Sequence, residues 1–124
     1  MRELAAVALG GAIGASLRWG IGTWWVDRTG PGFPWHTMFI NVCGAFLIGV
    51  LMALSMEKGL ISGDWRLFLG TGVLGGFTTF STLSYESLAL MQDGLWAAGL
   101  ANMFGSAVAG LLAAWLGVVA GRAL

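Results

Sequence analysis

Charged residues are scarce in this sequence. Only 10% of its 124 residues are Asp, Glu, Lys or Arg, whereas 57% are hydrophobic. A soluble domain of this size needs more charged residues than that to cover its surface. The six basic and six acidic residues also give a net charge of zero, which excludes the basic surface that binding to nucleic acid requires. The composition therefore predicts a chain whose solvent is the lipid bilayer.

Cysteine and histidine are nearly absent. The single cysteine, Cys43, lies inside an apolar run, so no disulfide can form within one chain, and we expect a small buried side chain. The single histidine, His36, is expected at the interface between lipid and water. Without a second histidine, a cysteine pair or a cluster of carboxylates, the sequence offers no transition-metal or hydrolytic site. We therefore predict that the protein is not an enzyme.

Long apolar runs are what the sequence has instead. Residues 37–56 and 94–121 contain no charged residue or histidine, and each run reaches the roughly 20 residues that cross a bilayer as a helix. Two further runs are interrupted, one by Arg18 and the other by Glu86 near its end. We therefore predict an all-α membrane protein with a single domain, residues 1–124, and transmembrane helices at about 4–26, 35–56, 65–91 and 94–121.

The two sides of this predicted bundle differ little in charge. The basic residues are Arg2, Lys58, Arg66 and Arg122 on the side of the termini, and Arg18 and Arg28 toward the other side. An excess of Lys and Arg marks the cytoplasmic ends of spans. The weak bias favours insertion in both orientations, although a modest preference for cytoplasmic termini leaves a similar pattern.

Small residues recur at a spacing of four. The pairs are Gly10 with Gly14, Gly72 with Gly76, Gly117 with Gly121, and Ser106 with Gly110. In lipid this spacing lets two helices approach closely. The pattern predicts tight helix packing, either within one chain or between two copies. Because no internal repeat relates the halves of the chain, a symmetric pathway needs a second copy.

The most unusual segment, residues 70–85, combines glycine with hydroxyl side chains at membrane depth. Gly75 and Gly76 are adjacent and are followed by Thr78 and Thr79, and all four residues have low helix propensity. A break here would free backbone carbonyls that can coordinate a cation. The alternative is an unbroken helix with a glycine-rich packing face, and spacing alone leaves both open.

Polar side chains continue beyond this segment. Ser81 and Tyr85 stand one turn apart, as do Thr82 and Glu86. The hydroxyls can donate hydrogen bonds to an anion, or they can bond to carbonyls of their own helix. Glu86 is the only acidic residue well inside an apolar run, which indicates a functional group unless its side chain extends to the interface.

Two asparagines lie inside predicted spans. Asn41 follows Thr37 by one turn, and Asn102 precedes Ser106 by one turn, so each pair lines one helix face. An asparagine in the membrane either joins helices or presents its amide protons to an anion, and position alone favours the first role. Arg18 needs partners such as backbone carbonyls or lipid phosphate, so we assign it a vestibule or structural role.

At these residues the sequence resembles the Fluc (CrcB) family of fluoride channels, across essentially its whole length. The segments that carry the resemblance are GGAIGASLRW at 10–19, TMFINVCGAFLIG at 37–49, GVLGGFTTFST at 72–82 and NMFGSAVAGL at 102–111. The resemblance implies an antiparallel homodimer of subunits in opposite orientations, with two pores along the subunit interface. It also implies a broken third helix and a structural sodium ion at the dimer centre, held by the backbone carbonyls of Gly75 and Thr78.

The resemblance further implies an ion pathway. Its predicted members are Asn41, Phe80, Ser81, Thr82 and Ser106, to which we add Thr37 and Glu86 from their positions. The edge of an aromatic ring carries partial positive charge, so Phe80 can face a small anion while hydroxyls and the amide replace its water. The family commonly has a second phenylalanine three residues later, where this chain has Leu83. Leucine has no electropositive edge, so we expect slower conduction or a larger share for the hydroxyls.

The sequence therefore predicts a passive, fluoride-selective channel that lets accumulated fluoride leave the cytoplasm across the bacterial inner membrane. Its expected partners are fluoride, membrane lipid and a second copy of itself. Two alternatives stay open. A small multidrug-type exporter needs a carboxylate in the middle of the first span, where this chain has only Glu3 at the start. A non-conducting partner subunit of a heterodimeric channel would use the polar residues for packing alone.

Overall fold

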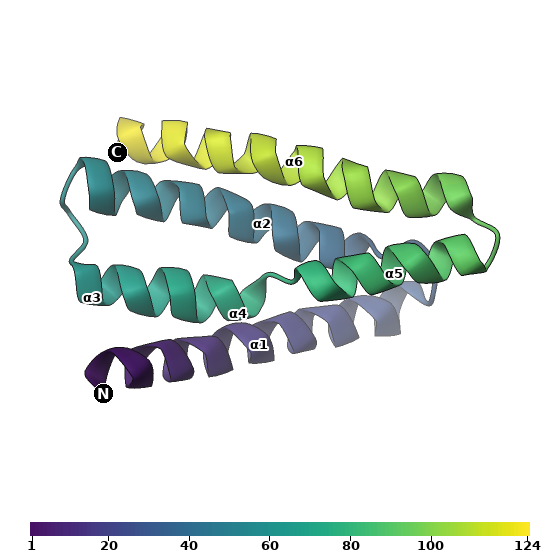
Figure 1. Cartoon of the computed structure of the whole chain (residues 1–124), viewed down its shortest axis with the longest axis horizontal. Coiled ribbons are helices and arrows are strands. Elements are labelled where there is room, and N and C mark those ends of the chain that lie inside the picture. The colour runs from purple at the N-terminus through teal and green to yellow at the C-terminus, as the bar shows by residue number, and fades with distance from the viewer.

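Four long helical segments lie side by side in the computed structural model, which describes all residues, 1–124 (Figure 1). The first is α1 (Arg2–Thr29), and the second is α2 (Trp35–Met52), which ends in a π-helical turn, η1 (Ala53–Glu57). The fourth is α6 (Trp96–Ala123). Each segment is long and apolar enough to cross a membrane. The predicted all-α fold with four spans is confirmed, and both termini lie at one end of the bundle.

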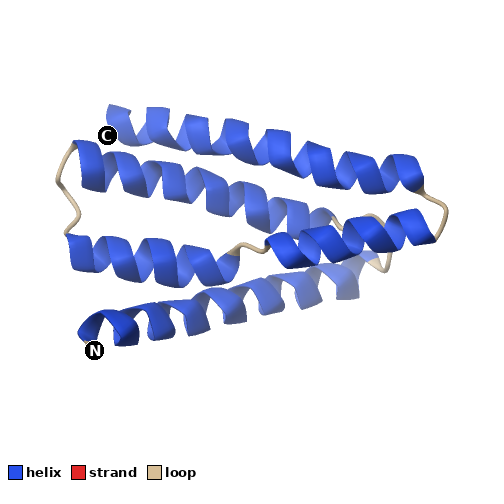
Figure 2. Cartoon of the chain, viewed as in Figure 1, coloured by secondary structure: helices blue, strands red, loops and turns tan.

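The third segment is broken. It consists of α3 (Gly63–Arg66), the π-helical η2 (Leu67–Leu74), α4 (Gly75–Phe77) and α5 (Phe80–Gln92). Between α4 and α5, Thr78 and Thr79 have extended backbone, with φ and ψ of −79° and 158° and of −152° and 116° (Figure 2). The break therefore lies at the two threonines, and the glycine pair before them stays helical. Their β-branched side chains favour extended backbone, which is consistent with this position.

Glycine allows the helices to pack closely. A Cβ atom on Gly10 of α1 would lie 2.8 Å from Cα of Gly72, and one on Gly117 of α6 would meet the carbonyl of Phe46 in α2. Three of the four spaced pairs make such contacts within one chain, whereas Gly110 has no neighbouring atom within 4 Å. These close approaches hold α1 against η2 and α4, and α6 against α2.

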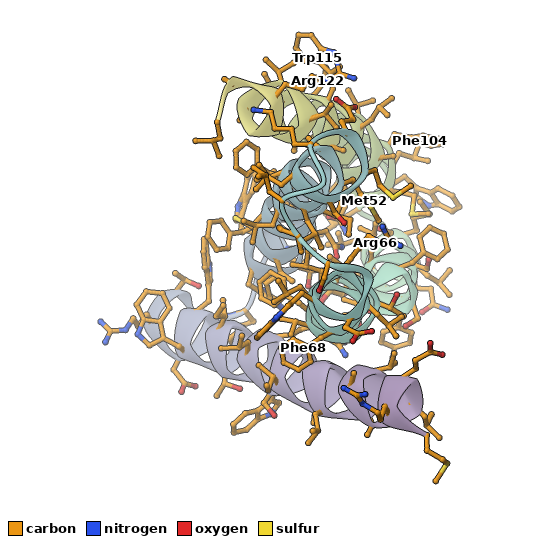
Figure 3. The ribbon with its side chains drawn as sticks, turned by 90° about the vertical axis from the view of Figure 1, so that its left-hand side faces the viewer. Met52, Arg66, Phe68, Phe104, Trp115 and Arg122 are labelled. Carbon is orange, nitrogen blue, oxygen red and sulfur yellow. The ribbon has the colours of Figure 1, made fainter.

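Large apolar side chains cover the outside of the bundle. Phe104 and Trp115 on α6 are 65% and 61% exposed and point away from the other helices (Figure 3). In lipid such a surface is well solvated, because no hydrophobic force requires it to be covered. Cys43, which we expected to be buried, is only partly buried. It lies on α2, two residues beyond Asn41.

Candidate ion pathway

Asn41 of α2 bonds to the backbone at the break. Its Nδ2 atom donates to the carbonyl oxygen of Thr79 at 3.0 Å, and its Oδ1 atom accepts the Thr79 N–H at 2.7 Å. The side chain thus replaces the two hydrogen bonds that a neighbouring strand would give to an extended residue. Gly44, three residues later on α2, leaves space for the methyl group of Thr78. The second N–H of the Asn41 amide remains available to another acceptor.

The backbone carbonyls of residues 75–78 lose their helical donors at the break, and Gly75 and Thr78 are two of them. In an unbroken helix the Thr79 N–H would bond to the Gly75 carbonyl, and the Thr82 N–H would bond to the Thr78 carbonyl. The Thr79 N–H donates to Asn41 instead, and the Thr82 N–H donates to Oγ1 of Thr79 at 3.2 Å. Neither carbonyl receives its helical hydrogen bond, so the oxygens of Gly75 and Thr78 are available to a hard cation.

Arg18 reaches the same break from α1. Its Nε atom donates to the carbonyl oxygen of Gly76 at 3.2 Å. The partner that an intramembrane arginine needs is therefore a backbone carbonyl of α4, one residue after Gly75. Arg18 also lines a cavity of about 400 Å³ between α1, α2 and the start of α5, together with Thr37, Thr79 and Thr82. The position combines a structural contact with access to this cavity.

The hydroxyls of α5 fall into two groups. Ser84 and Ser87 donate to the carbonyls of Phe80 and Leu83, one turn earlier in the same helix, at 2.9 and 2.8 Å. Ser81 and Thr82 make no such bond: the Ser81 hydroxyl lies 3.5 Å from Oγ1 of Thr79, and the Thr82 hydroxyl accepts a hydrogen bond from Oγ1 of Thr79 at 3.0 Å. The hydroxyls nearest the break therefore keep capacity for a ligand, whereas the later ones are committed to their own helix.

A groove of about 440 Å³ runs between α2, α6 and the broken segment. The predicted site residues that line it are Asn41, Gly75, Thr78, Phe80 and Ser106. The Phe80 side chain is 71% exposed beside the groove, whereas Leu83, one turn later, is only 6% exposed. The hydroxyl oxygen of Ser106 is buried and has no hydrogen-bond partner in the chain. The groove is thus lined by an aromatic ring, an amide and a serine whose buried hydroxyl has no partner in the chain.

Glu86 lies at the far end of this arrangement. Its Oε1 atom accepts a hydrogen bond from the Thr37 hydroxyl at 2.8 Å and lies 3.6 Å from Nε2 of His36, while its buried Oε2 atom has no partner. Thr37 lines the 400 Å³ cavity, and Thr79 lines both this cavity and the groove. The two hollows therefore both border Thr79 at the break, whereas Ser81 and Glu86 line neither of them.

Asn102 plays a different role from Asn41. It is completely buried, and its Nδ2 atom donates to the Ser87 hydroxyl at 3.0 Å. The bond joins α6 to α5, so this asparagine links two helices. Its Oδ1 atom has no partner. Although Asn102 and Ser106 are one turn apart, only Ser106 lines the groove.

Sequence reasoning missed two residues of this site. Thr79 was noted only as part of the break, although its hydroxyl caps α5 and its backbone binds Asn41. The sequence contained a signal for the cap, because threonine is a preferred N-cap residue and its hydroxyl can accept the N–H of the residue three positions later, here Thr82. His36 was placed at the interface without a partner, because its contact with Glu86 joins residues 50 positions apart in the chain. Such a contact leaves no local pattern.

Comparison with known proteins identifies the family. The family model described as CrcB-like protein, Camphor Resistance (CrcB), matches residues 5–118. The chain belongs to the CrcB family. Two CrcB relatives from Thermus thermophilus, each named fluoride-specific ion channel FluC, are 57% and 53% identical over 118 and 124 residues. These matches cover 95% and 100% of this chain and 92% and 98% of the relatives.

A third CrcB relative, also named fluoride-specific ion channel FluC, comes from Chloroflexus aurantiacus. It is 48% identical over 122 residues, which cover 98% of this chain and 97% of the relative. The resemblance first recognised in the four sequence segments is therefore confirmed. The matches extend well beyond those segments and include the loops and both halves of the broken helix.

Proposed function

We propose that the chain is a passive, fluoride-selective channel. The observation that carries this proposal is a set of polar groups around the broken third helix that keep hydrogen-bonding capacity, beside the exposed ring of Phe80. We call this set the row; it comprises Asn41, Ser81, Thr82 and Ser106. The CrcB relatives are named as fluoride-specific channels, which supports it. A channel of this kind moves an ion down its electrochemical gradient and catalyses no reaction.

The row suits an anion that accepts hydrogen bonds strongly. Asn41 offers its second amide proton, and Ser106 offers a hydroxyl with no other partner. The edge of the Phe80 ring adds partial positive charge without a permanent cation. These neutral donors replace the water of a small anion without binding it so tightly that it stays. Leu83 supplies only an apolar wall, so fluoride depends more on the hydroxyls in this chain.

The working unit is an antiparallel pair of copies. One chain forms an open groove, and Phe80 and Gly75 at its edge are both exposed. A second copy in the opposite orientation closes the groove on each side and gives two pathways at the interface. The weak bias in the distribution of basic residues between the two sides supports insertion in both orientations.

A sodium ion fits between the two breaks. Each chain offers the carbonyls of Gly75 and Thr78, both without their helical donors. A hard monovalent cation prefers oxygen ligands, and unwound backbone inside a membrane is a known source of them. The ion would fix the two broken helices against each other. Its role is structural, because the sodium ion stays between the two broken helices and is not transported along the pathway.

The membrane is the bacterial inner membrane, and the direction of flux is outward whenever fluoride has accumulated inside. Four apolar helices and bacterial relatives support this location. A proton-coupled exporter fits less well, because the only carboxylate on α1 before Asp27 is Glu3 in its first turn. A non-conducting partner subunit remains the alternative that experiment must exclude, and the uncommitted donors argue against it.

The test is fluoride efflux from liposomes that contain only this protein, measured with a fluoride electrode and with chloride as the control anion. We expect fluoride efflux without chloride efflux, and its loss in Phe80→Ile. The matched control is Phe104→Ile, which replaces another exposed aromatic residue that points away from the other helices (Figure 3). Folded protein without fluoride efflux would contradict the proposal and leave the partner-subunit alternative.

A further inference from the structure

His36 is the only histidine of the chain, and it lies beside Glu86, the predicted pathway residue that bonds to Thr37. Its Nε2 atom is 3.6 Å from Oε1 of Glu86, and the two side chains are 22% and 20% exposed. This distance is longer than a hydrogen bond, so the two side chains attract each other as charges only when His36 is protonated. The other oxygen of Glu86 is buried without a partner. The carboxylate is therefore only partly compensated.

The charges around this cavity come from three helices. α1 contributes Arg18 and Asp27, and α2 contributes His36, all of which line the cavity. α5 contributes Glu86, which does not line the cavity but bonds to Thr37 in its wall, whereas Arg28 of α1 lies outside the lining and over the Trp24 ring. α6 has no charged residue before its last turn. We call this cavity, with Glu86 beside it, the mouth of the pathway. With neutral His36 these four side chains hold one positive and two negative charges, so the mouth repels anions. With protonated His36 the charges balance and the repulsion disappears.

Histidine is the member of this set that changes its charge near neutral pH. Imidazole is the type of side chain in this set that ordinarily gains or loses a proton near neutral pH. A mouth whose charge matches its ion raises the local concentration of that ion and its rate of entry. A carboxylate at the entrance of an anion pathway is otherwise an obstacle.

We propose that His36 is a further residue of the ion pathway, which cancels the charge of Glu86 when protonated and so makes fluoride entry faster at acidic pH. The inference rests on the proposed channel function. His36 acts on the ion through the charge of the mouth. Its position at the start of α2, one residue before Thr37, places it where an ion would enter the row.

The experiment measures fluoride efflux with the same pH on both sides of the liposome membrane, so the orientation of the protein does not matter. Efflux from protein-free liposomes is subtracted at each pH, because hydrogen fluoride crosses lipid by itself. We expect wild-type efflux to be about threefold to tenfold faster at about pH 6 than at about pH 8, from the change in charge at the mouth.

Three variants separate the contribution of His36. His36→Gln stays neutral and is expected to give the slow rate at both pH values, whereas His36→Lys stays charged and is expected to give the fast rate at both. The control is Glu57→Gln, because Glu57 pairs with Arg122 at 2.7 and 2.8 Å at the other end of the bundle. This variant is expected to keep the wild-type dependence on pH.

The outcomes distinguish the two proposals. Fluoride efflux that depends equally on pH in wild type and in His36→Gln overturns the role of His36 and leaves the channel function intact. The same holds if His36→Lys is no faster than wild type at the higher pH. A wild type without efflux at either pH overturns the channel function, and the role of His36 falls with it.

Discussion

The two asparagines inside the membrane have similar sequence surroundings but different hydrogen-bond partners in the structure. Each lies in an apolar span one turn from a hydroxyl residue. Asn41 bonds at both ends of its amide to the backbone of Thr79, where the third helix is broken. Asn102 makes one bond to the Ser87 hydroxyl and leaves its oxygen unpaired in a fully buried position.

The difference lies in the partner. Backbone groups at a break have no alternative partner in lipid, so the side chain that satisfies them is required for the fold at that point. A serine hydroxyl on an intact helix can bond to its own helix, as Ser87 does with Leu83. Loss of the Asn102 side chain therefore leaves the Ser87 hydroxyl with its bond to the Leu83 carbonyl. The structure predicts a large effect at Asn41 and a small one at Asn102.

The largest effect is expected for Asn41→Leu. This change removes both hydrogen bonds to Thr79 and leaves its N–H and carbonyl unsatisfied, at a cost of about 1–3 kcal/mol for each group. We expect the protein to unfold at lower SDS concentration in mixed micelles and fluoride efflux to fall to the protein-free level.

A second variant at the same position separates the two bonds of Asn41. Asn41→Asp keeps an acceptor for the Thr79 N–H, loses the donor to the Thr79 carbonyl and adds a negative charge beside the groove. We expect partial recovery of stability without recovery of fluoride efflux. If Asn41→Leu were as stable as wild type, the break would not depend on this side chain.

The next effect concerns the α5–α6 contact around Asn102. A Cβ atom on Gly99 would lie 2.7 Å from the carbonyl oxygen of Ser87 and 2.6 Å from Cγ of Met91. Gly99→Ala therefore pushes the helices apart, with an expected loss of about 1–3 kcal/mol in the same SDS titration. Gly110→Ala is the matched control, because nothing lies within 4 Å of that position. Equal stability of both variants would contradict the packing described.

The third effect is smaller and concerns the cap of α5. Thr79→Val keeps the β-branched shape and the backbone bonds to Asn41, but it removes the hydroxyl that accepts the Thr82 N–H. Loss of such a cap costs about 1 kcal/mol. We expect a modest loss of stability and slower fluoride efflux, since Ser81 and Thr82 lose a neighbouring hydroxyl. A loss of stability as large as in Asn41→Leu would show that the Thr79 hydroxyl, and not the backbone bonds of Thr79 to Asn41, stabilises the break.

Much of the fold could be predicted from the sequence. Two charge-free runs and two apolar runs interrupted by Arg18 and Glu86 predicted the number of helices, and the low helix propensity of residues 75–79 indicated where the third helix weakens. The sequence left the exact position of the break open within these residues, and Asn41 and Gly44 of another helix hold it at Thr78 and Thr79. No local pattern contains those contacts.

The site was predictable to a lesser degree. Family motifs named most of its residues, but they do not state which polar atoms remain uncommitted. Ser81 and Ser84 look equivalent in the sequence, yet only Ser84 bonds to a carbonyl of its own helix. The contact between His36 and Glu86 depends on how α2 packs against α5. Such differences arise from tertiary geometry.

The smallest effect is expected for Asn102→Leu, which has a similar volume. The variant loses the bond to Ser87, a helix-to-helix bond of about 1 kcal/mol or less in membranes, and also removes an unpaired buried oxygen. The two changes oppose each other, so we expect stability within about 1 kcal/mol of wild type in the SDS titration. Fluoride efflux should remain close to wild type, because Asn102 does not line the groove. A loss of efflux with unchanged stability would instead place Asn102 in the pathway, and the contrast with Asn41 would then be one of degree.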